Sequence, residues 1–169
     1  MRTEDFLPDV NIDGYIVPLS KLIKKFKPKK GLEIGFCWGA SAYAYLENSD
    51  GTLLSIDLAD HKGKESVFKS TYKDRWNIVY GDSHKLLPEI KEKFDYIYVD
   101  GEHWYEDAKA DIRDSWPLLK KGGIMVCDDY NDHEREGGVL KALNEFAQEN
   151  KLEIRKIPNH SNEAVYILK

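Results

Sequence analysis

The chain has 169 residues, of which 41% are hydrophobic and 33% are charged, and its formal net charge is −5. A chain of this length supports one hydrophobic core, so we expect a single domain over residues 1–169, made of an N-terminal segment 1–30 with one helix and a core over 31–169. No apolar run approaches the roughly 18 residues of a membrane span. The net charge gives no broad basic surface for nucleic acid. The polar start, and two cysteines in no metal or disulfide spacing, favour a cytoplasmic protein.

Apolar periodicity predicts helices alternating with strands. A helical stripe after Pro18 precedes the first strand. The expected strands are 31–35, 52–58, 76–81, 94–100, 122–128, 152–157 and 164–169. The expected helices between them are 41–48, 64–75, 83–93, 104–119 and 139–150. Because about six residues separate the last two strands, too few for a parallel crossover, we expect those strands to be antiparallel.

This alternation predicts an α/β fold with a mostly parallel sheet and helices on both faces. Ligands of such sheets bind beyond the carboxyl ends of the strands, near the switch in strand order. The residues that follow the strands are therefore the first candidates for a site. They are Gly35 to Ser41, Asp57, Asp82 with Ser83, Asp100 to Trp104, and Asp128 to Asn131.

The first of these segments, EIGFCWGAS over residues 33–41, joins a strand to a helix through a loop bracketed by glycines. Gly35 and Gly39 would let the backbone approach a ligand, and Ser41 can satisfy amides at the helix start. The segment lacks the Gly-Lys-Ser/Thr end of a P-loop, and Cys37 replaces the second glycine of a dinucleotide loop. A pyrophosphate ligand is therefore disfavoured.

Acids follow the next two strands. Asp57 ends the second strand, where a carboxylate can accept hydrogen bonds from ribose hydroxyls. Asp82 and Ser83 follow the third strand and could reach an adenine edge. Each residue also has a purely structural interpretation, as a turn residue, a loop acid or a helix cap. Their occurrence at successive strand ends favours a ligand site.

Several motifs, in their order along the chain, resemble the class I S-adenosylmethionine-dependent methyltransferases. They are E-I-G-x-x-x-G-x-S, the acid after the second strand, G-D-S, F-D-Y-I-Y-V-D and L-L-K-K-G-G, and they span nearly the whole chain. The resemblance implies a Rossmann-like seven-stranded sheet with an antiparallel last strand and S-adenosylmethionine across its first strands. The G-x-x-x-G-x-S form is similar to the catechol and caffeoyl-coenzyme A type of O-methyltransferase.

The resemblance also implies roles for single residues. The loop after the first strand would face the methionine part, Asp57 the ribose, and Asp82 with Ser83 the adenine. The implied cofactor-binding residues are Glu33, Gly35, Phe36, Cys37, Trp38, Gly39, Ser41, Asp57, Leu58, Asp82, Ser83, Asp100 and His103. The core over 31–169 would then be the catalytic core, and its partner a small-molecule hydroxyl acceptor.

Three carboxylates are expected to meet at one rim. Asp100 ends the fourth strand, and Asp128 with Asp129 end the fifth. Carboxylates this close need a compensating cation or a shared proton. Oxygen ligands without a Cys or His cluster point to a hard divalent ion, Mg²⁺ or another of that kind. The motif D-G-x-H-x-Y, followed by D-D-Y, resembles the macrocin and cephamycin-type methyltransferases. In the alternative without a metal, Asp100 would face the cofactor, and Asp128 and Asp129 would form a turn.

His103, with Asp100, is the candidate catalytic residue. A neutral imidazole could accept a hydroxyl proton, but His103 could equally cap its helix or line the cofactor pocket. Trp104 is expected in the core or the pocket wall. Trp38, Tyr130 and His133 are expected to line the acceptor pocket. Glu102 is a further candidate ligand for a cation, with weaker support. Asp107, Asp111 and Asp114 are expected on a solvated helix face.

The expected function is metal-assisted transfer of a methyl group from S-adenosylmethionine to a small-molecule hydroxyl. A metal-independent methyltransferase, a non-catalytic binder of S-adenosylmethionine and, less favoured, a nicotinamide oxidoreductase remain alternatives. The chain has few residues before its first strand and no long insertion. The acceptor pocket is therefore expected to be open, or completed by another subunit of a homo-oligomer.

Overall fold

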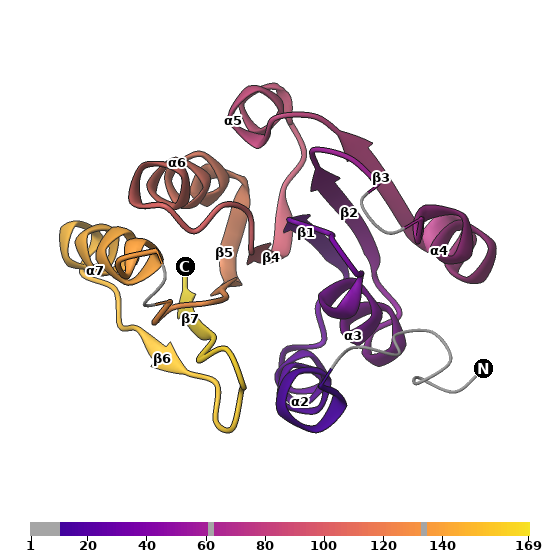
Figure 1. Cartoon of the computed structure of the whole chain (residues 1–169), viewed down its shortest axis with the longest axis horizontal. Coiled ribbons are helices and arrows are strands. Elements are labelled where there is room, and N and C mark those ends of the chain that lie inside the picture. The colour runs from indigo at the N-terminus through magenta and orange to yellow at the C-terminus, as the bar shows by residue number, and fades with distance from the viewer. Residues whose placement is uncertain (1–10, 61–62, 133–134) are drawn as a thin grey trace.

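Seven strands form one mixed sheet in the computed structural model, which describes residues 11–60, 63–132 and 135–169 (Figure 1). The strands are β1 Lys30–Ile34, β2 Thr52–Asp57, β3 Trp76–Tyr80, β4 Phe94–Val99, β5 Leu119–Cys127, β6 Arg155–Lys156 and β7 Val165–Leu168. Their order is β3-β2-β1-β4-β5-β7-β6. Strands β1 to β5 pair in parallel, and β7 runs antiparallel to both β5 and β6. This topology confirms the expected fold.

Helices cover both faces of the sheet. The longer ones are α2 Val17–Phe26, α3 Ala40–Asn48, α4 Glu65–Tyr72, α6 Tyr105–Ser115 and α7 Gly138–Asn150. The short ones are η1 Ile12–Ile16, η2 Lys73–Arg75, α5 Ser83–Leu86, η3 Leu87–Glu89 and η4 Trp116–Leu118. One core lies under α2, α3 and α4, and the other under α6 and α7. None of the helices in the described part of the chain has the length and apolar character of a membrane span.

Strand β4 shows why the sheet is buried on both sides. Successive side chains of a strand point to opposite faces. Tyr96 and Tyr98 pack into the first core, and Ile97 and Val99 pack into the second. Strand β4 therefore occupies the middle of the sheet, and its carboxyl end opens on the switch point between β1 and β4.

The expected elements differ from the structure at a few boundaries. The expected helix 83–93 is only the single turn α5 followed by η3, because Pro88 lacks an amide donor and its ring opposes a continuous α-helix. The expected strand 152–157 shortens to β6. Trp104 is not in the core: it is the N-cap of α6, and 49% of its surface is exposed.

Candidate active site

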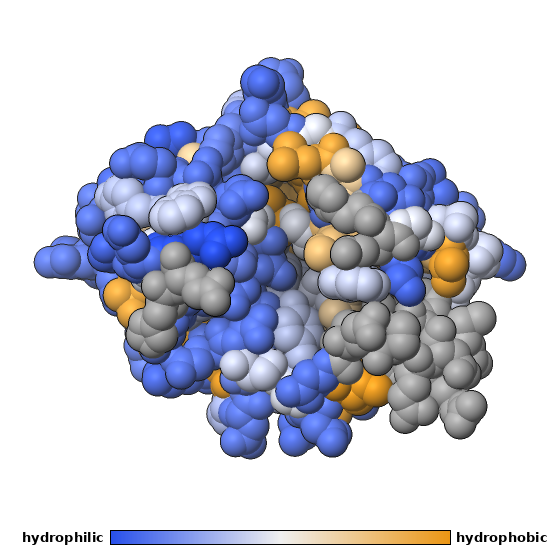
Figure 2. Space-filling model, in the orientation of Figure 1, coloured by the Kyte–Doolittle hydropathy of each residue, from blue (hydrophilic) through white to orange (hydrophobic). Residues whose placement is uncertain are grey.

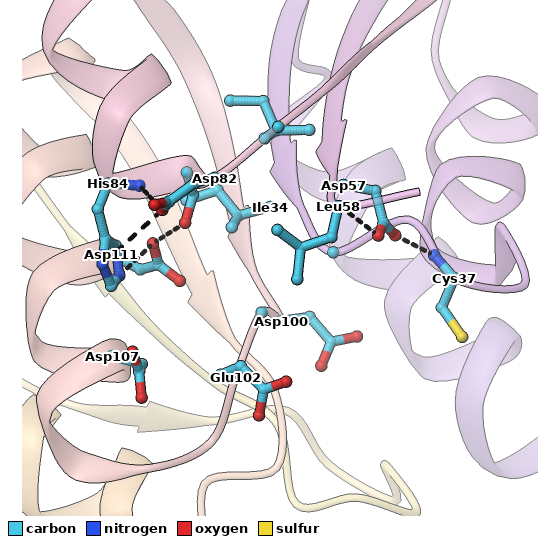
Figure 3. A pocket seen from close by; sticks show the side chains of 15 residues that line it. Ile34, Cys37, Asp57, Leu58, Asp82, His84, Asp100, Glu102, Asp107 and Asp111 are labelled. Carbon is cyan, nitrogen blue, oxygen red and sulfur yellow. Dashed lines mark hydrogen bonds and ion pairs between the residues drawn. The ribbon is translucent and has the colours of Figure 1, made fainter. Parts of the chain in front are cut away.

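A cleft of about 480 Å³ opens at the carboxyl ends of β1 to β4 (Figure 3). It is lined by Ile34, Gly35, Cys37, Ile56, Asp57, Leu58, Gly81, Asp82, Ser83, His84, Asp100, Gly101, Glu102, Asp107 and Asp111. The structure thus brings together seven of the residues predicted to bind a cofactor, from Gly35 to Asp100. The face shown in Figure 2 is hollowed near its middle, with hydrophobic residues along one rim of the hollow.

The loop after β1 crosses the end of β4 at very short range. Gly35 has a φ of +88°, a region that side chains disfavour. A Cβ at this position would stand 1.8 Å from the carbonyl oxygen of Asp100. The amide of Gly35 donates a hydrogen bond of 2.9 Å to the carbonyl oxygen of Ile56. Gly35 is therefore required by close backbone packing, which also brings the loop to the rim where Asp100 lies.

Asp57 holds this loop in place. Its Oδ2 accepts hydrogen bonds of 2.8 Å from the amides of both Phe36 and Cys37, and its Oδ1 accepts one of 2.6 Å from the amide of Leu58. The sequence suggested ribose binding for Asp57 but not this contact with the loop. Because the carboxylate also lines the cleft, it can fix the loop and face a ligand at once.

Glu33 lies behind the loop, outside the lining of the cleft. Its two carboxylate oxygens accept hydrogen bonds of 2.5 Å from the hydroxyls of Ser41 and Ser55. The Ser55 hydroxyl in turn accepts a hydrogen bond of 3.0 Å from the indole of Trp76. Burial raises the pKa of Glu33 to about 7, although the two hydroxyl donors oppose this shift. The carboxyl thus links β1, α3 and β2 beneath the site.

Glu33 should make folding stability fall as pH rises. The folded state binds this proton more tightly than the unfolded chain, whose pKa is 4.5, so the stabilisation is lost as pH rises through about 7. Between pH 5.5 and 8 the loss from this group is about 2 kcal/mol. Urea unfolding at the two pH values should show a smaller pH dependence for Glu33→Gln than for the exposed control Glu149→Gln. An unchanged pH dependence in Glu33→Gln would refute this assignment.

A second pocket of about 260 Å³ adjoins the cleft and shares Cys37 and Asp100 with it. It is lined by Asn11, Tyr15, Phe36, Cys37, Trp38, Ala40, Ser41, Asp100, Ser161 and Asn162. Trp38 and Phe36 therefore face this pocket and not the cleft. Tyr130 is absent from its described lining and hydrogen-bonds Asn144, and His133 lies outside the described residues.

Three side chains converge at the shared rim. Potential ligand atoms of Asp100, His103 and Asp129 all lie within 4.8 Å of one another. Nε2 of His103 lies 3.4 Å from Asp100 Oδ1 and 3.5 Å from Asp129 Oδ2. Nδ1 of the same ring lies 3.1 Å from Asp132 Oδ2. The imidazole is thus surrounded by three carboxylates.

Asp128, the third predicted metal ligand, points into the protein instead. It is 1% exposed, and its Oδ2 accepts a hydrogen bond of 2.6 Å from the hydroxyl of Tyr98. Its Oδ1 accepts one of 2.9 Å from the amide of Asp129 and lies 3.6 Å from Nδ1 of His160. A buried carboxylate needs such partners, and Tyr98 supplies one from the neighbouring strand. The converging set in the structure is therefore Asp100, His103 and Asp129.

The rim retains a proton. Burial raises the pKa of the Asp100 carboxyl well above its ordinary value, and the adjacent Asp128 carboxylate raises it further. The hydrogen bond to Asp100 raises the pKa of His103 to about 9, although burial opposes that shift. Burial, and then the nearby Asp128, raises the pKa of Asp129 to about 6. At neutral pH the Asp100–His103 pair therefore keeps a proton, which balances charge among the carboxylates.

Asp111 is buried, so the expectation of a solvated helix face for this residue is wrong. It is 2% exposed, and its Oδ1 accepts a hydrogen bond of 2.7 Å from the hydroxyl of Ser83. A signal was present in the sequence, because Asp111 falls at helical spacing between Ala108 and Ile112, both of which are buried. Tyr15 and His160 carried no comparable signal, since long-range contacts bring them to the site.

The strand order, the glycine-bracketed loop and the acids at the strand ends are those of the class I S-adenosylmethionine-dependent methyltransferases. Residues 32–130 match a family model described as a methyltransferase domain, and the chain belongs to this family. Among curated relatives, O-methyltransferase hkm8 of Aspergillus hancockii is 30% identical over 110 residues, which cover 61% of this chain and 43% of that protein. Catechol O-methyltransferase of Sus scrofa is 27% identical over 117 residues, covering 63% of each.

This chain thus spans less than two thirds of the curated relatives that it matches. Two solved structures share the fold. The methyltransferase PaMTH1 of Podospora anserina, bound to S-adenosylhomocysteine, has a TM-score of 0.74 at 21% identity, covering 99% of this chain and 82% of that one. The O-methyltransferase of Bacillus cereus in complex with the same ligand has a TM-score of 0.73 at 17% identity, covering 99% and 86%.

Proposed function

We propose that this protein binds S-adenosylmethionine in the cleft and transfers its methyl group to a hydroxyl oxygen of a small molecule. The observation that carries the proposal is the pair of adjoining cavities, which share Asp100 and Cys37. One cavity is lined by the acids at the strand ends, and the other by Trp38, Phe36 and Tyr15. A cofactor in the first cavity and an acceptor in the second would lie on opposite sides of one rim, as direct transfer requires.

The predicted cofactor residues divide between the two cavities. Asp57 would accept hydrogen bonds from the ribose hydroxyls. Asp82 and Ser83 would face the adenine, which would lie beside the exposed side chain of Leu58. The methionine part would extend along Gly35 and Cys37 to the rim at Asp100. Ser41 lines the second pocket, and Gly39 lines neither cavity. The family membership and the S-adenosylhomocysteine named in the two similar structures support this placement.

The rim fits a hard divalent cation, and we propose Mg²⁺ there. Asp100 and Asp129 supply carboxylate oxygens, and His103 can add a nitrogen. When bound, such an ion lowers the pKa of an acceptor hydroxyl. Asp128 would not contact the ion. It accepts a hydrogen bond from the amide of Asp129, and so fixes the backbone that carries the Asp129 carboxylate.

The contribution of the protein to catalysis would be positioning and proton control. The leaving group is already activated by the sulfonium charge of the cofactor, so alignment supplies most of the acceleration. His103 accepts a hydroxyl proton only in its neutral form, and its pKa of about 9 means that the proton held with Asp100 must leave first. A metal-independent methyltransferase is the second candidate, and this retained proton favours it.

A calorimetric titration tests the cofactor assignment. The full chain should bind S-adenosylhomocysteine with a stoichiometry of one, and it should not bind NAD⁺, because the loop lacks the glycine pattern of a pyrophosphate site. A chain that binds NAD⁺ and not S-adenosylhomocysteine would be an oxidoreductase. If methyl transfer survives exhaustive chelation, the protein is a methyltransferase that needs no metal, and the proposed Mg²⁺ site is wrong.

Thiol labelling locates the bound cofactor. Cys37 is exposed and lines both cavities, whereas Cys127 is buried in the sheet. S-adenosylhomocysteine should therefore slow maleimide labelling of Cys37 in proportion to the fraction of protein bound. The variant Cys37→Ser should show no labelling under native conditions, which controls for Cys127. Labelling of Cys37 that a saturating ligand leaves unchanged would place the ligand elsewhere.

A further inference from the structure

Asp111 is a buried acid in the cleft to which neither the sequence nor the proposed chemistry gives a role. It belongs to α6, two turns after the N-cap, and it lines the cleft beside the residues that follow β3. Its Oδ1 accepts a hydrogen bond of 2.7 Å from the hydroxyl of Ser83. The same oxygen lies 3.6 Å from Nε2 of His84 (Figure 3). Its Oδ2 lies 2.7 Å from where a Cβ at Gly101 would stand. The carboxylate thus spans the ends of β3 and β4.

The hydrogen bond to Asp111 fixes which way the Ser83 hydroxyl points. An ionised carboxylate only accepts hydrogen bonds, and a hydroxyl has a single proton to donate. Burial raises the pKa of Asp111 to about 6, so the carboxyl is mostly ionised at neutral pH. The Ser83 proton is therefore committed to Asp111, and the oxygen of Ser83 presents its lone pairs to the cleft.

The surrounding side chains are also mostly acceptors. Asp82 lies in this part of the cleft, and Asp107 lies one turn before Asp111 on α6, whereas Glu102 lies beside Asp100 (Figure 3). His84 is the exception, and its ring lies between Asp82 and Asp111, at 4.0 and 3.6 Å from their oxygens. A ligand group that lies against the oxygen of Ser83 should therefore donate a hydrogen bond. The exocyclic amino group is the donor on the exposed edge of adenine.

We infer that Asp111 is a specificity-determining residue, which holds Ser83 as a hydrogen-bond acceptor and so selects a 6-amino purine over a 6-oxo purine. The inference rests on the proposed cofactor site. A 6-oxo base presents an oxygen where the amino group would be. Two acceptors would then face each other in a partly desolvated cleft, and neither would be satisfied. Asp111 acts through Ser83, so its effect should appear as a ratio of affinities.

The test compares S-adenosylhomocysteine with S-inosylhomocysteine, its 6-oxo analogue, by calorimetry on the full chain. The unaltered protein should bind the 6-amino ligand at least about tenfold more tightly, the cost of one unsatisfied polar contact. In Asp111→Asn the amide can donate to Ser83 and free its proton, so the ratio should fall to about threefold or less. Asp114→Asn, on the same helix outside the cleft lining, should keep the original ratio.

A second variant guards against misfolding of the first. Asp111→Leu keeps the branching at Cγ without a buried polar group, and it also releases the Ser83 proton, so it should lose the same selectivity. A merely structural role would weaken both ligands equally and leave the ratio unchanged, which would overturn the inference while the cofactor site stands. Failure of the unaltered protein to bind S-adenosylhomocysteine would instead overturn the proposed function.

Discussion

Asp128→Ala is expected to lower the free energy of unfolding by about 3–4 kcal/mol. The substitution removes the acceptor for the buried Tyr98 hydroxyl and for the partly buried amide of Asp129. The substitution would also disturb η1, because the hydroxyl of Tyr98 shares a hydrogen bond of 2.7 Å with the hydroxyl of Tyr15 in that helix. Urea unfolding followed by tryptophan fluorescence measures the difference.

Asp129→Asn is the matched control for this prediction. Asp129 is only partly buried and has a φ of +46°, a backbone conformation that asparagine tolerates well. The variant should therefore have a free energy of unfolding within about 1 kcal/mol of the unaltered protein. Methyl transfer should nevertheless fall, because the neutral amide binds a hard cation more weakly than a carboxylate does. If Asp128→Ala were as stable as the unaltered protein and lost only transfer, Asp128 would be a metal ligand, as the sequence suggested.

Asp57→Ala is expected to weaken S-adenosylhomocysteine binding by about 100-fold or more. Each hydrogen bond from a backbone amide to an ionised carboxylate contributes about 1.5–3 kcal/mol, and Asp57 Oδ2 accepts two of them. Without these bonds the loop over residues 35–39 is no longer preorganised, and the ribose loses its expected partner. Calorimetry measures the affinity directly.

Asp50→Ala provides the comparison for Asp57→Ala. Asp50 is an exposed acid whose ion pair with Lys29 lies at the opposite end of β1, so cofactor affinity should not change. The conservative variant Asp57→Asn keeps one acceptor oxygen, so its affinity for S-adenosylhomocysteine should lie between those of Asp57→Ala and Asp50→Ala. An Asp57→Ala affinity within threefold of the unaltered protein would mean that the loop is held by other contacts.

The fold was largely predictable because its signals are local. Alternation in FDYIYV identified a strand buried on both faces, and the regular succession of strands and helices predicted the parallel sheet. The carboxyl ends of those strands then brought the candidate residues to one cleft. Pro88 is also a local signal, and it ends the α-helix after β3 at Leu86, short of the expected residue 93.

The directions of side chains at the site were not predictable in the same way. Adjacent acids at the end of β5 point differently because Tyr98, Tyr15 and His160, far apart in sequence, converge on Asp128. Asp111 is buried because Ser83, on another element, satisfies it. Such pairings depend on tertiary structure and not on local pattern. Mg²⁺, the homo-oligomer, the cytoplasmic location and the extent of the domain stay predictions.

A crystal structure of the full chain grown with S-adenosylhomocysteine and Mg²⁺ tests the central claim most directly. We predict the adenine beside Asp82 and Ser83, the ribose hydroxyls within hydrogen-bond distance of Asp57, and the sulfur at the Asp100 rim, facing the pocket lined by Trp38. The metal should lie between Asp100 and Asp129. A ligand bound outside the cleft, or with its nucleoside in the second pocket, would contradict this account.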